Sequence, residues 1–401
     1  MAREFMEAPL SWRSVVAKSR HLSPVGIRKF FAKLPDPRRR LTRVRYRLLS
    51  LIVIAVCATI AGANDSEEIA LFARTHRAWL ARLIELPDDP EQTPSHDTFD
   101  RVLSALDPIA FQKCLLAWLQ ALHEHTQGLI AIDGKAAREA MARAGDQGPL
   151  TLVSAWASAN HLFLGQVAAA PGSNELEAIP RLLELLDLEG AIVTLDALGC
   201  QQAIVEQIVD KKGDYVIAVK GNQPTLQAAV HKALDEAVSQ EPVTAVTLLK
   251  EDNRRSRQET RLYVVVPVPP EAPEFDEWTG AKSLVSVTRE YVDGKGQTQT
   301  GTRYYLSSLP PKVKLLAQAV RGHWKVENQL HWVLDVTFRE DHNRSRAGHA
   351  QANLGVLRRL ALSMLKNAPG LKGSIDSRRK QAGWDEATLE KTLFGRQVSE
   401  S

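Results

Sequence analysis

The segment AIVTLDALGCQQAIVEQIVDKKGDYVIAVKG, residues 191–221, decides the fold. AIVTLD is an apolar run that ends in Asp196, CQQAIVEQIVDKKG has the apolar spacing of a helix, and DYVIAVKG is a second apolar run. The segment therefore predicts strand, helix and strand. It does not predict a phosphate-binding loop, because VKGNQPT lacks the spacing of a Walker A motif.

Three more apolar runs lie upstream, at residues 128–133, 150–158 and 161–169, and an amphipathic helix follows over residues 173–190. The predicted order is three strands that can pair as a meander, then helix, strand, helix and strand. This is the order of an α/β ribonuclease-H-like fold, in which helices flank a mixed five-stranded sheet. A Rossmann sheet would carry G-x-G-x-x-G after its first strand, where this chain has DGKAARE.

The regions on either side of this core differ in composition. Residues 1–125 are predicted to form a basic, helical N-terminal domain that binds DNA or assists binding, and residues 126–370 a catalytic domain with a β-rich insertion at about 225–310. A helical segment at 311–338 follows the insertion, and residues 371–401 are expected to be a basic C-terminal tail.

Charge and apolar content limit the possible partners and location. Residues 1–48 hold 13 Lys and Arg against 3 Asp and Glu, a composition typical of a solvated surface or of a contact with phosphate backbone. The run LLSLIVIAVCATIAG, residues 48–62, is shorter than the roughly 20 residues of a membrane span and predicts a buried helix. Three scattered cysteines and no visible signal peptide predict a cytoplasmic protein without membrane contact.

Two acids end predicted strands. Asp133 follows LIAI and precedes Gly134, where we expect a sharp turn, and Asp196 ends the fourth strand. In a ribonuclease-H-like sheet these two strands are parallel neighbours, so both carboxylates should meet at one edge. Paired carboxylates resist ionisation unless a cation lies between them, and hard oxygen ligands suit Mg²⁺ or Mn²⁺.

A third acid should come from the helix at 311–338. Glu327 is the best candidate, one turn after Trp324, and the alternatives are Asp335, Glu340 and Asp341. Three acids and two metal ions perform phosphoryl transfer at a phosphodiester without a protein nucleophile. Zinc is the alternative metal, with His123 and His125 as possible ligands, but no third ligand lies at a zinc-site spacing.

Several long stretches are distinctive, among them FAKLPDPRRR, PSHDTFDRVLSALDP, IAIDGK, SNELEAIP, TLDALGCQ, GDYVIAVKGNQ and RGHWKVENQLHWVLDVTFRED. They resemble the transposases of bacterial insertion sequences of the ISAs type, the group that includes the H-repeat-associated proteins. The resemblance covers nearly the whole chain. It implies a DDE transposase that cleaves DNA at the inverted-repeat ends of its element and joins them to target DNA, as a homodimer on the bacterial nucleoid, with Asp133, Asp196 and Glu327 as catalytic metal ligands.

Related transposases carry a tyrosine, an arginine and a lysine at fixed offsets around this glutamate, where this chain has Val320, His323 and Leu334. The sequence AAREA after Lys135 also departs from the related pattern. Candidate DNA contacts are Arg38, Arg39, Arg40, Lys135, Lys220, Arg321, His323 and Lys325. Trp324 is a further candidate, either as a core residue or as a platform for an unpaired base.

Two other functions remain open. One is a catalytically silent DNA-binding relic of a transposase, and the other is a metal-dependent nuclease without strand transfer.

Overall fold

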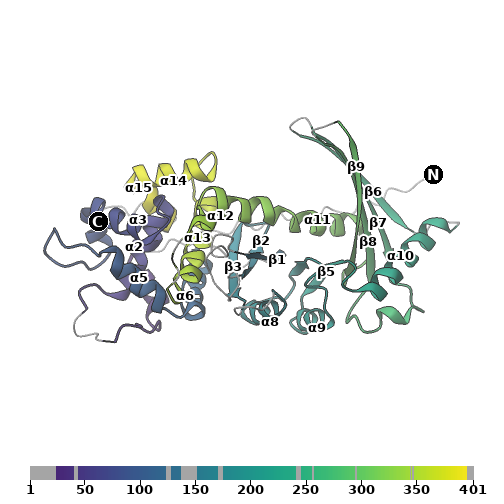
Figure 1. Cartoon of the computed structure of the whole chain (residues 1–401), viewed down its shortest axis with the longest axis horizontal. Coiled ribbons are helices and arrows are strands. Elements are labelled where there is room, and N and C mark those ends of the chain that lie inside the picture. Colours follow the sequence, from purple (N-terminus) through teal and green to yellow (C-terminus); the bar gives the residue numbers. More distant parts are fainter. Residues whose placement is uncertain are drawn as a thin grey trace.

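The computed structural model describes residues 24–39, 44–122, 128–136, 151–169, 175–240, 245–254, 257–293, 296–343, 345 and 347–394. The molecule is elongated: a helical lobe lies at one end, a sheet crosses the middle, and a β-stranded arm rises from the other end (Figure 1).

The predicted mixed α/β sheet is confirmed, and it is larger than five strands. Nine strands form one sheet in the order β3-β2-β1-β4-β5-β9-β8-β7-β6. The strands before the arm are β1 (Leu129–Ala136), β2 (Thr151–Ala157), β3 (Leu162–Ala168), β4 (Ile192–Leu195) and β5 (Asp214–Val219). β1 is antiparallel to β2 and parallel to β4, and β4 is parallel to β5.

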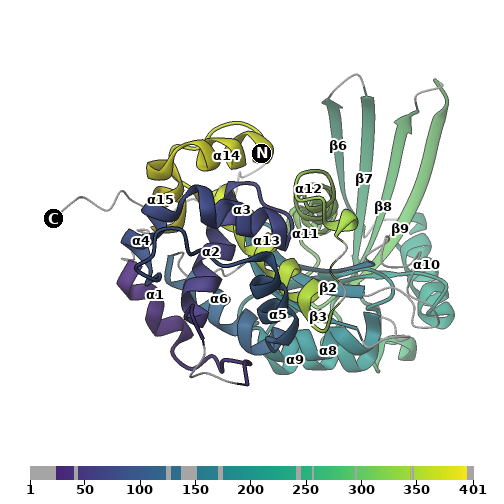
Figure 2. The ribbon, with the colours of Figure 1, turned by 60° about the vertical axis from the view of Figure 1, so that its left-hand side comes forward.

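The predicted β-rich insertion begins with a helix, α10 (Pro224–Ser239), and continues as four strands that extend the sheet. These are β6 (Val246–Arg254), β7 (Arg257–Pro267), β8 (Ser283–Val292) and β9 (Thr298–Ser307). β9 pairs with β5, which makes the arm continuous with the central sheet. The first five residues of β8 are buried and the rest are not, so the far half of the arm projects from the body (Figure 2).

Helices cover both faces of the sheet. One face packs against α8 (Glu175–Leu185) and α9 (Gln202–Asp210), around a core that includes Ile130, Ile132 and Ile179. The other face carries α11 (Val313–His323), which packs on β1, β4 and β5. Because side chains alternate along a strand, residues 129, 131, 133 and 135 of β1 face the α11 side.

The helical lobe is built from both ends of the described chain. The N-terminal helices are α1 (Pro24–Phe31), α2 (Leu48–Ala61), α3 (Ser66–Thr75), α4 (Arg77–Leu83), α5 (His96–Ala105) and α6 (Pro108–Leu122). α2 is buried along most of its length, as its apolar sequence predicts. It packs against α13 (Ala350–Asn367), α14 (Ile375–Trp384) and α15 (Glu386–Phe394). The expected basic tail therefore contains two helices whose apolar residues Leu389, Leu393 and Phe394 are buried in the lobe.

No single helix among the described residues is long and apolar enough to cross a membrane. Two bent pairs, α2 with α3 and α5 with α6, meet that test only when their lengths are added together.

Candidate active site

Asp133 and Asp196 lie opposite one another on neighbouring parallel strands. The β1–β4 register places Ala131 beside Thr194, and two residues further along each strand lead to the two acids. The sharp turn expected at Gly134 is wrong: β1 continues to Ala136 and pairs with β2 beyond Asp133. Asp196 does end its strand, and its Oδ1 accepts hydrogen bonds from the backbone N–H groups of Leu198 at 3.0 Å and Gly199 at 3.3 Å.

Glu327 begins a π-helical turn, Glu327–His331, between α11 and α12 (Trp332–Val336). Wider turns of this kind are frequent at functional sites. Glu327 is exposed. It lines one cavity of about 900 Å³ together with Asp133 and Asp196. Within the described ranges, no three His, Cys, Asp or Glu side chains are close enough together to hold a metal ion.

Two histidines lie beside the paired acids: His323, which the sequence offered only as a candidate DNA contact, and His331, which no sequence pattern singled out. His331 is 8% exposed and lines the cavity. Its Nε2 lies 3.2 Å from Asp133 Oδ2, yet neither ring nitrogen has a hydrogen-bond partner of good geometry. His323 is equally buried, with Nδ1 3.1 Å from the Thr194 hydroxyl. Burial lowers the pKa of His323, although Asp133 and Asp196 oppose this effect.

A fourth acid, Glu175, reaches the same region from the first residue of α8. Burial, followed by the negative charges of Asp133 and Asp196, raises the pKa of the Glu175 carboxyl to about 7. No sequence motif pointed to this residue. Gly134, expected as a turn residue, lies inside strand β1, and a glycine within a strand often marks a close approach by another group.

The alternative third acids lie in an ionic cluster next to the cavity. The Lys135 ammonium contacts the carboxylates of Asp335, Glu340 at 3.3 Å and Asp341 at 3.1 Å. Glu340 is 5% exposed, and its Oε1 also accepts a 2.6 Å hydrogen bond from Arg359. Burial opposes ionisation of Glu340, but the charges of Arg359, Lys135 and Arg358 lower its pKa to about 2. These contacts tie the end of β1 to the helices that follow Glu327.

The predicted DNA contacts fall into different environments. Lys220 is exposed and lines the acid cavity, and Arg321 and Lys325 line a second cavity under the arm. His323 and Lys135 also border the acid cavity, but both side chains are largely buried: His323 contacts Thr194, and Lys135 pairs with Glu340.

The N-terminal arginines also differ from one another. Arg38 binds Asp36 and donates a 2.8 Å hydrogen bond to the Tyr46 carbonyl, whereas Arg39 is exposed. Arg40 lies outside the described residues, as do His123 and His125 of the zinc alternative.

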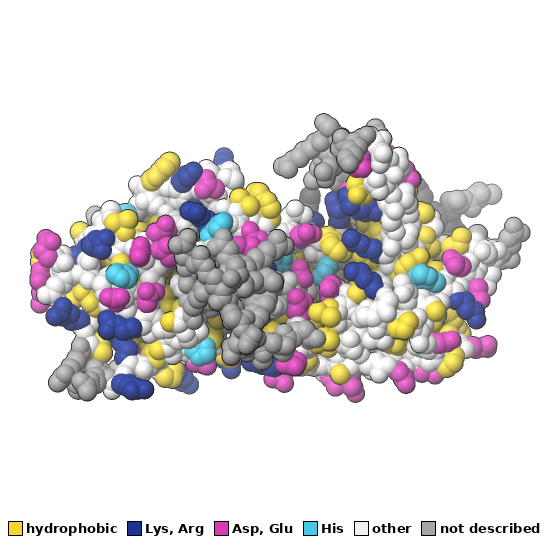
Figure 3. Space-filling view, in the orientation of Figure 1, with side chains coloured by type: hydrophobic (Ala, Val, Ile, Leu, Met, Phe, Trp, Pro, Cys, Tyr) yellow, Lys and Arg dark blue, Asp and Glu magenta, His cyan; other side chains and the backbone are white. Residues whose placement is uncertain are grey.

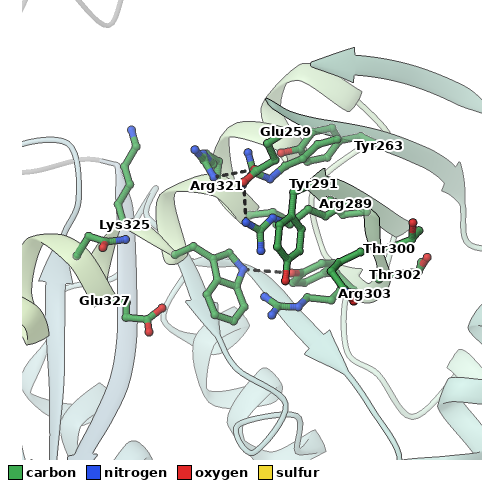
Figure 4. Close-up of a pocket in the computed structure, with 18 of the residues that line it drawn as sticks. Glu259, Tyr263, Arg289, Tyr291, Thr300, Thr302, Arg303, Arg321, Lys325 and Glu327 are labelled. Atoms are coloured by element: carbon green, nitrogen blue, oxygen red, sulfur yellow. Dashed lines mark hydrogen bonds and ion pairs between the residues drawn. The ribbon is translucent and has the colours of Figure 1, made fainter. Parts of the chain in front are cut away.

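The second cavity, about 810 Å³, is a basic groove formed by the arm and α11. Figure 4 shows Arg289, Arg303 and Arg321 around it, with Glu327 near its edge. Glu259 pairs with Arg289 at 2.7 Å. Lys and Arg side chains also gather on the visible face of the arm (Figure 3).

Trp324 lies between the two cavities and lines both. It is partly buried, and the Arg303 guanidinium lies 3.9 Å from the centre of its ring. Its indole N–H is 3.4 Å from the Tyr305 hydroxyl. The basic groove and the acid cavity also share Thr302, Arg303, Tyr305, Glu327 and Asn328, so they form one continuous surface.

Comparisons with known proteins identify relatives over most of the chain. A family model described as "Transposase DDE domain" matches residues 124–364, and one described as "DDE_Tnp_1-associated" matches residues 28–119. YncI of Escherichia coli O157:H7, named as a transposase, is 38% identical over 91% of this chain and 93% of its own length. The H repeat-associated YhhI of E. coli K12, also named as a transposase, is 34% identical over 91% and 97%. An uncharacterised protein from the dhlA 3′ region of Xanthobacter autotrophicus is 35% identical over 70% and 93%.

Proposed function

Since the chain belongs to the transposases that carry a DDE domain, we propose that it cleaves DNA at the inverted-repeat ends of a bacterial insertion sequence and joins those ends to target DNA. One observation carries the proposal. Asp133 and Asp196 extend from adjacent parallel strands into a cavity that Glu327 also lines. We assign these three acids as the catalytic set and the first five strands with their helices as a ribonuclease-H-like domain.

The donor set fits a divalent cation. Asp133 and Asp196 offer hard oxygen donors, and no Lys or Arg within the described residues forms an ion pair with either. Mg²⁺ or Mn²⁺, two ions in the complete site, would activate a water or a DNA 3′-hydroxyl and stabilise the leaving oxygen. Glu327, which lines the same cavity, would be the third acidic ligand when DNA and metal are bound.

Neighbouring groups of the protein hold the catalytic acids in position. The backbone N–H groups of Leu198 and Gly199 fix the orientation of Asp196. His323 fills the space beneath the acid pair and contacts Thr194.

The basic groove under the arm supplies the path for DNA. Its cations suit a phosphate backbone, and it leads to the acid cavity through Arg303 and Trp324. We assign Lys220, Arg321 and Lys325 to this path, and Arg39 with the N-terminal lobe to a second contact with the element ends. Joining two ends requires two active sites, so we propose a homodimer on DNA at the nucleoid.

The test is incubation of the protein with Mg²⁺ or Mn²⁺ and DNA that carries the terminal repeats flanking its gene. We expect nicking at the repeat ends and joining to a target plasmid. Both products should be lost in Asp133→Asn, Asp196→Asn and Glu327→Gln, with DNA binding retained. Binding without cleavage in the wild type would identify a catalytically silent relic, and cleavage without joining would identify a nuclease.

A further inference from the structure

Gly134 is a strand residue whose missing side chain leaves room for another group. It pairs with Val153 of β2 and does not have a positive φ, so its backbone conformation does not require glycine. A Cβ added at Gly134 would collide with Cδ and both carboxylate oxygens of Glu175. The carboxylate of Glu175 therefore occupies the place where any other residue at 134 would put its side chain.

This arrangement brings Glu175 to Asp133 from the opposite side of the strand. Asp133 faces α11, whereas Gly134 faces α8, the helix that Glu175 begins. Glu175 is half-buried and interacts electrostatically with Asp133, Asp196 and His331. Three carboxylates are thus concentrated around the ends of β1 and β4.

His331 gives an independent indication that a ligand belongs here. It is more than nine-tenths buried, it faces Asp133, and both of its ring nitrogens lack a hydrogen-bond partner. Buried polar groups are nearly always satisfied, so an orphaned one beside an acid pair marks a place for a missing ion or its water.

We propose that Glu175 is a fourth carboxylate of the metal site, where it binds the divalent cation of Asp133 and Asp196 directly or through a water. Position 134 is a glycine because any side chain there would occupy the space of the Glu175 carboxylate. The inference rests on the proposed function, since it takes Asp133 and Asp196 as metal ligands. A carboxylate that holds a metal-bound water orients it much as a direct ligand would.

The test measures Mn²⁺ binding to the full-length, DNA-free protein by isothermal titration and by the Mn²⁺ paramagnetic resonance signal. We expect Glu175→Gln to weaken Mn²⁺ binding by about tenfold or more, the usual cost of removing a group that supports a metal site. Glu177→Gln, an exposed acid on the same helix, is the matched control and should leave binding unchanged. Asp133→Asn should abolish it.

The outcomes separate the role of Glu175 from the proposed metal site of Asp133 and Asp196. If Asp133→Asn abolishes Mn²⁺ binding but Glu175→Gln leaves it at the wild-type value, the role of Glu175 is overturned and the acid pair stands. If the wild type binds no Mn²⁺ at millimolar concentration, or Asp133→Asn binds it normally, both hypotheses fail.

A second pair of variants tests the role of Gly134. Gly134→Ala should displace Glu175, lower the melting temperature and weaken Mn²⁺ binding as Glu175→Gln does. In Glu175→Ala protein the same substitution should cost little stability, because the collision is gone, while Mn²⁺ binding stays weak. Equal loss of melting temperature in both backgrounds would contradict the steric explanation.

Discussion

Glu340 shows how a single buried acid stabilises the region behind the active site. Its carboxylate lies between Arg359, whose side chain is fully buried, and the Lys135 ammonium at the end of β1. Removing one charge from such a cluster leaves the others buried without compensation, which costs more than the pair contributes when intact.

We therefore predict that Glu340→Gln lowers the free energy of unfolding by about 3–5 kcal/mol, measured by urea denaturation at pH 7. Glu189→Gln is the control, because that acid pairs with Lys212 at the surface and should change stability by less than about 1 kcal/mol. A similar small loss in both variants would mean that the buried cluster is energetically neutral.

The same residue predicts a pH dependence. Its pKa is about 2 in the folded protein and near 4.5 when unfolded. Because the folded pKa is the lower one, the stabilisation is fully present above pH 4.5 and is lost as the pH falls from 4.5 towards 2. Wild type should lose stability across this window, and Glu340→Gln should lose less over the same range.

At the scale of elements, α11 is held against the sheet by a close backbone contact. A Cβ added at Gly322 would collide with the Leu129 side chain, and the Ser158 hydroxyl donates a 3.2 Å hydrogen bond to the Gly322 carbonyl. The distance between helix and sheet at this point affects the position of Glu327, five residues further along the chain, in the lining of the acid cavity.

Gly322→Ala should push α11 away from β1, reduce strand cleavage and destabilise the protein by about 1–3 kcal/mol, the usual cost of overpacking. Cleavage of repeat-end DNA and thermal unfolding measure the two effects. Leu129→Ala in the same chain removes the clashing atoms and should recover part of the cleavage. Loss of cleavage that Leu129→Ala does not relieve would argue against the steric route.

The arm gives a second prediction at this scale. Arg303→Gln should weaken DNA binding and reduce the salt slope of the affinity by about 1, because one phosphate contact is lost. Lys212→Gln, with the same charge change, is the control, since Lys212 precedes the first residue of β5, whereas Asp196 follows the last residue of the parallel strand β4. Fluorescence anisotropy at several salt concentrations provides the measurement. An unchanged slope for Arg303→Gln would remove this residue from the DNA path.

The elements also show where sequence patterns are informative. The strands on which Asp133 and Asp196 lie were predicted because buried strands form apolar runs that a local window detects. β6 was not, because VTLLKEDNR is half polar and lies at the sheet edge, where packing does not select apolar residues. Glu175 and His331 could not be assigned to the site from spacing, since their roles depend on how α8 and the π-helical turn Glu327–His331 pack.

At the scale of the whole molecule, the two ends of the chain meet in one helical lobe. Arg379 of α14 is 4% exposed and donates hydrogen bonds to the Thr59 and Ala63 carbonyls at the end of α2, and to the Thr337 carbonyl after α12. Its guanidinium also lies 4.2 Å from the centre of the Phe338 ring. The sequence after residue 370 was expected to be a basic tail, but Arg379 is buried in the lobe and connects three segments of the chain.

Arg379→Ala should therefore lower the free energy of unfolding by about 2–4 kcal/mol, because it leaves several buried carbonyls unsatisfied. Lys380→Ala is the matched control: Lys380 follows Arg379 in sequence, is exposed and pairs with Asp376 at 2.8 Å, so its removal should cost less than about 1 kcal/mol. Truncation after residue 370 should be more severe, because it also exposes the part of α2 that α14 and α15 cover. A truncated protein that unfolds at the wild-type temperature would show that the lobe is stable without the C-terminal helices. In that case their role would have to be sought in DNA binding, where the wild type and the truncated chain can be compared directly.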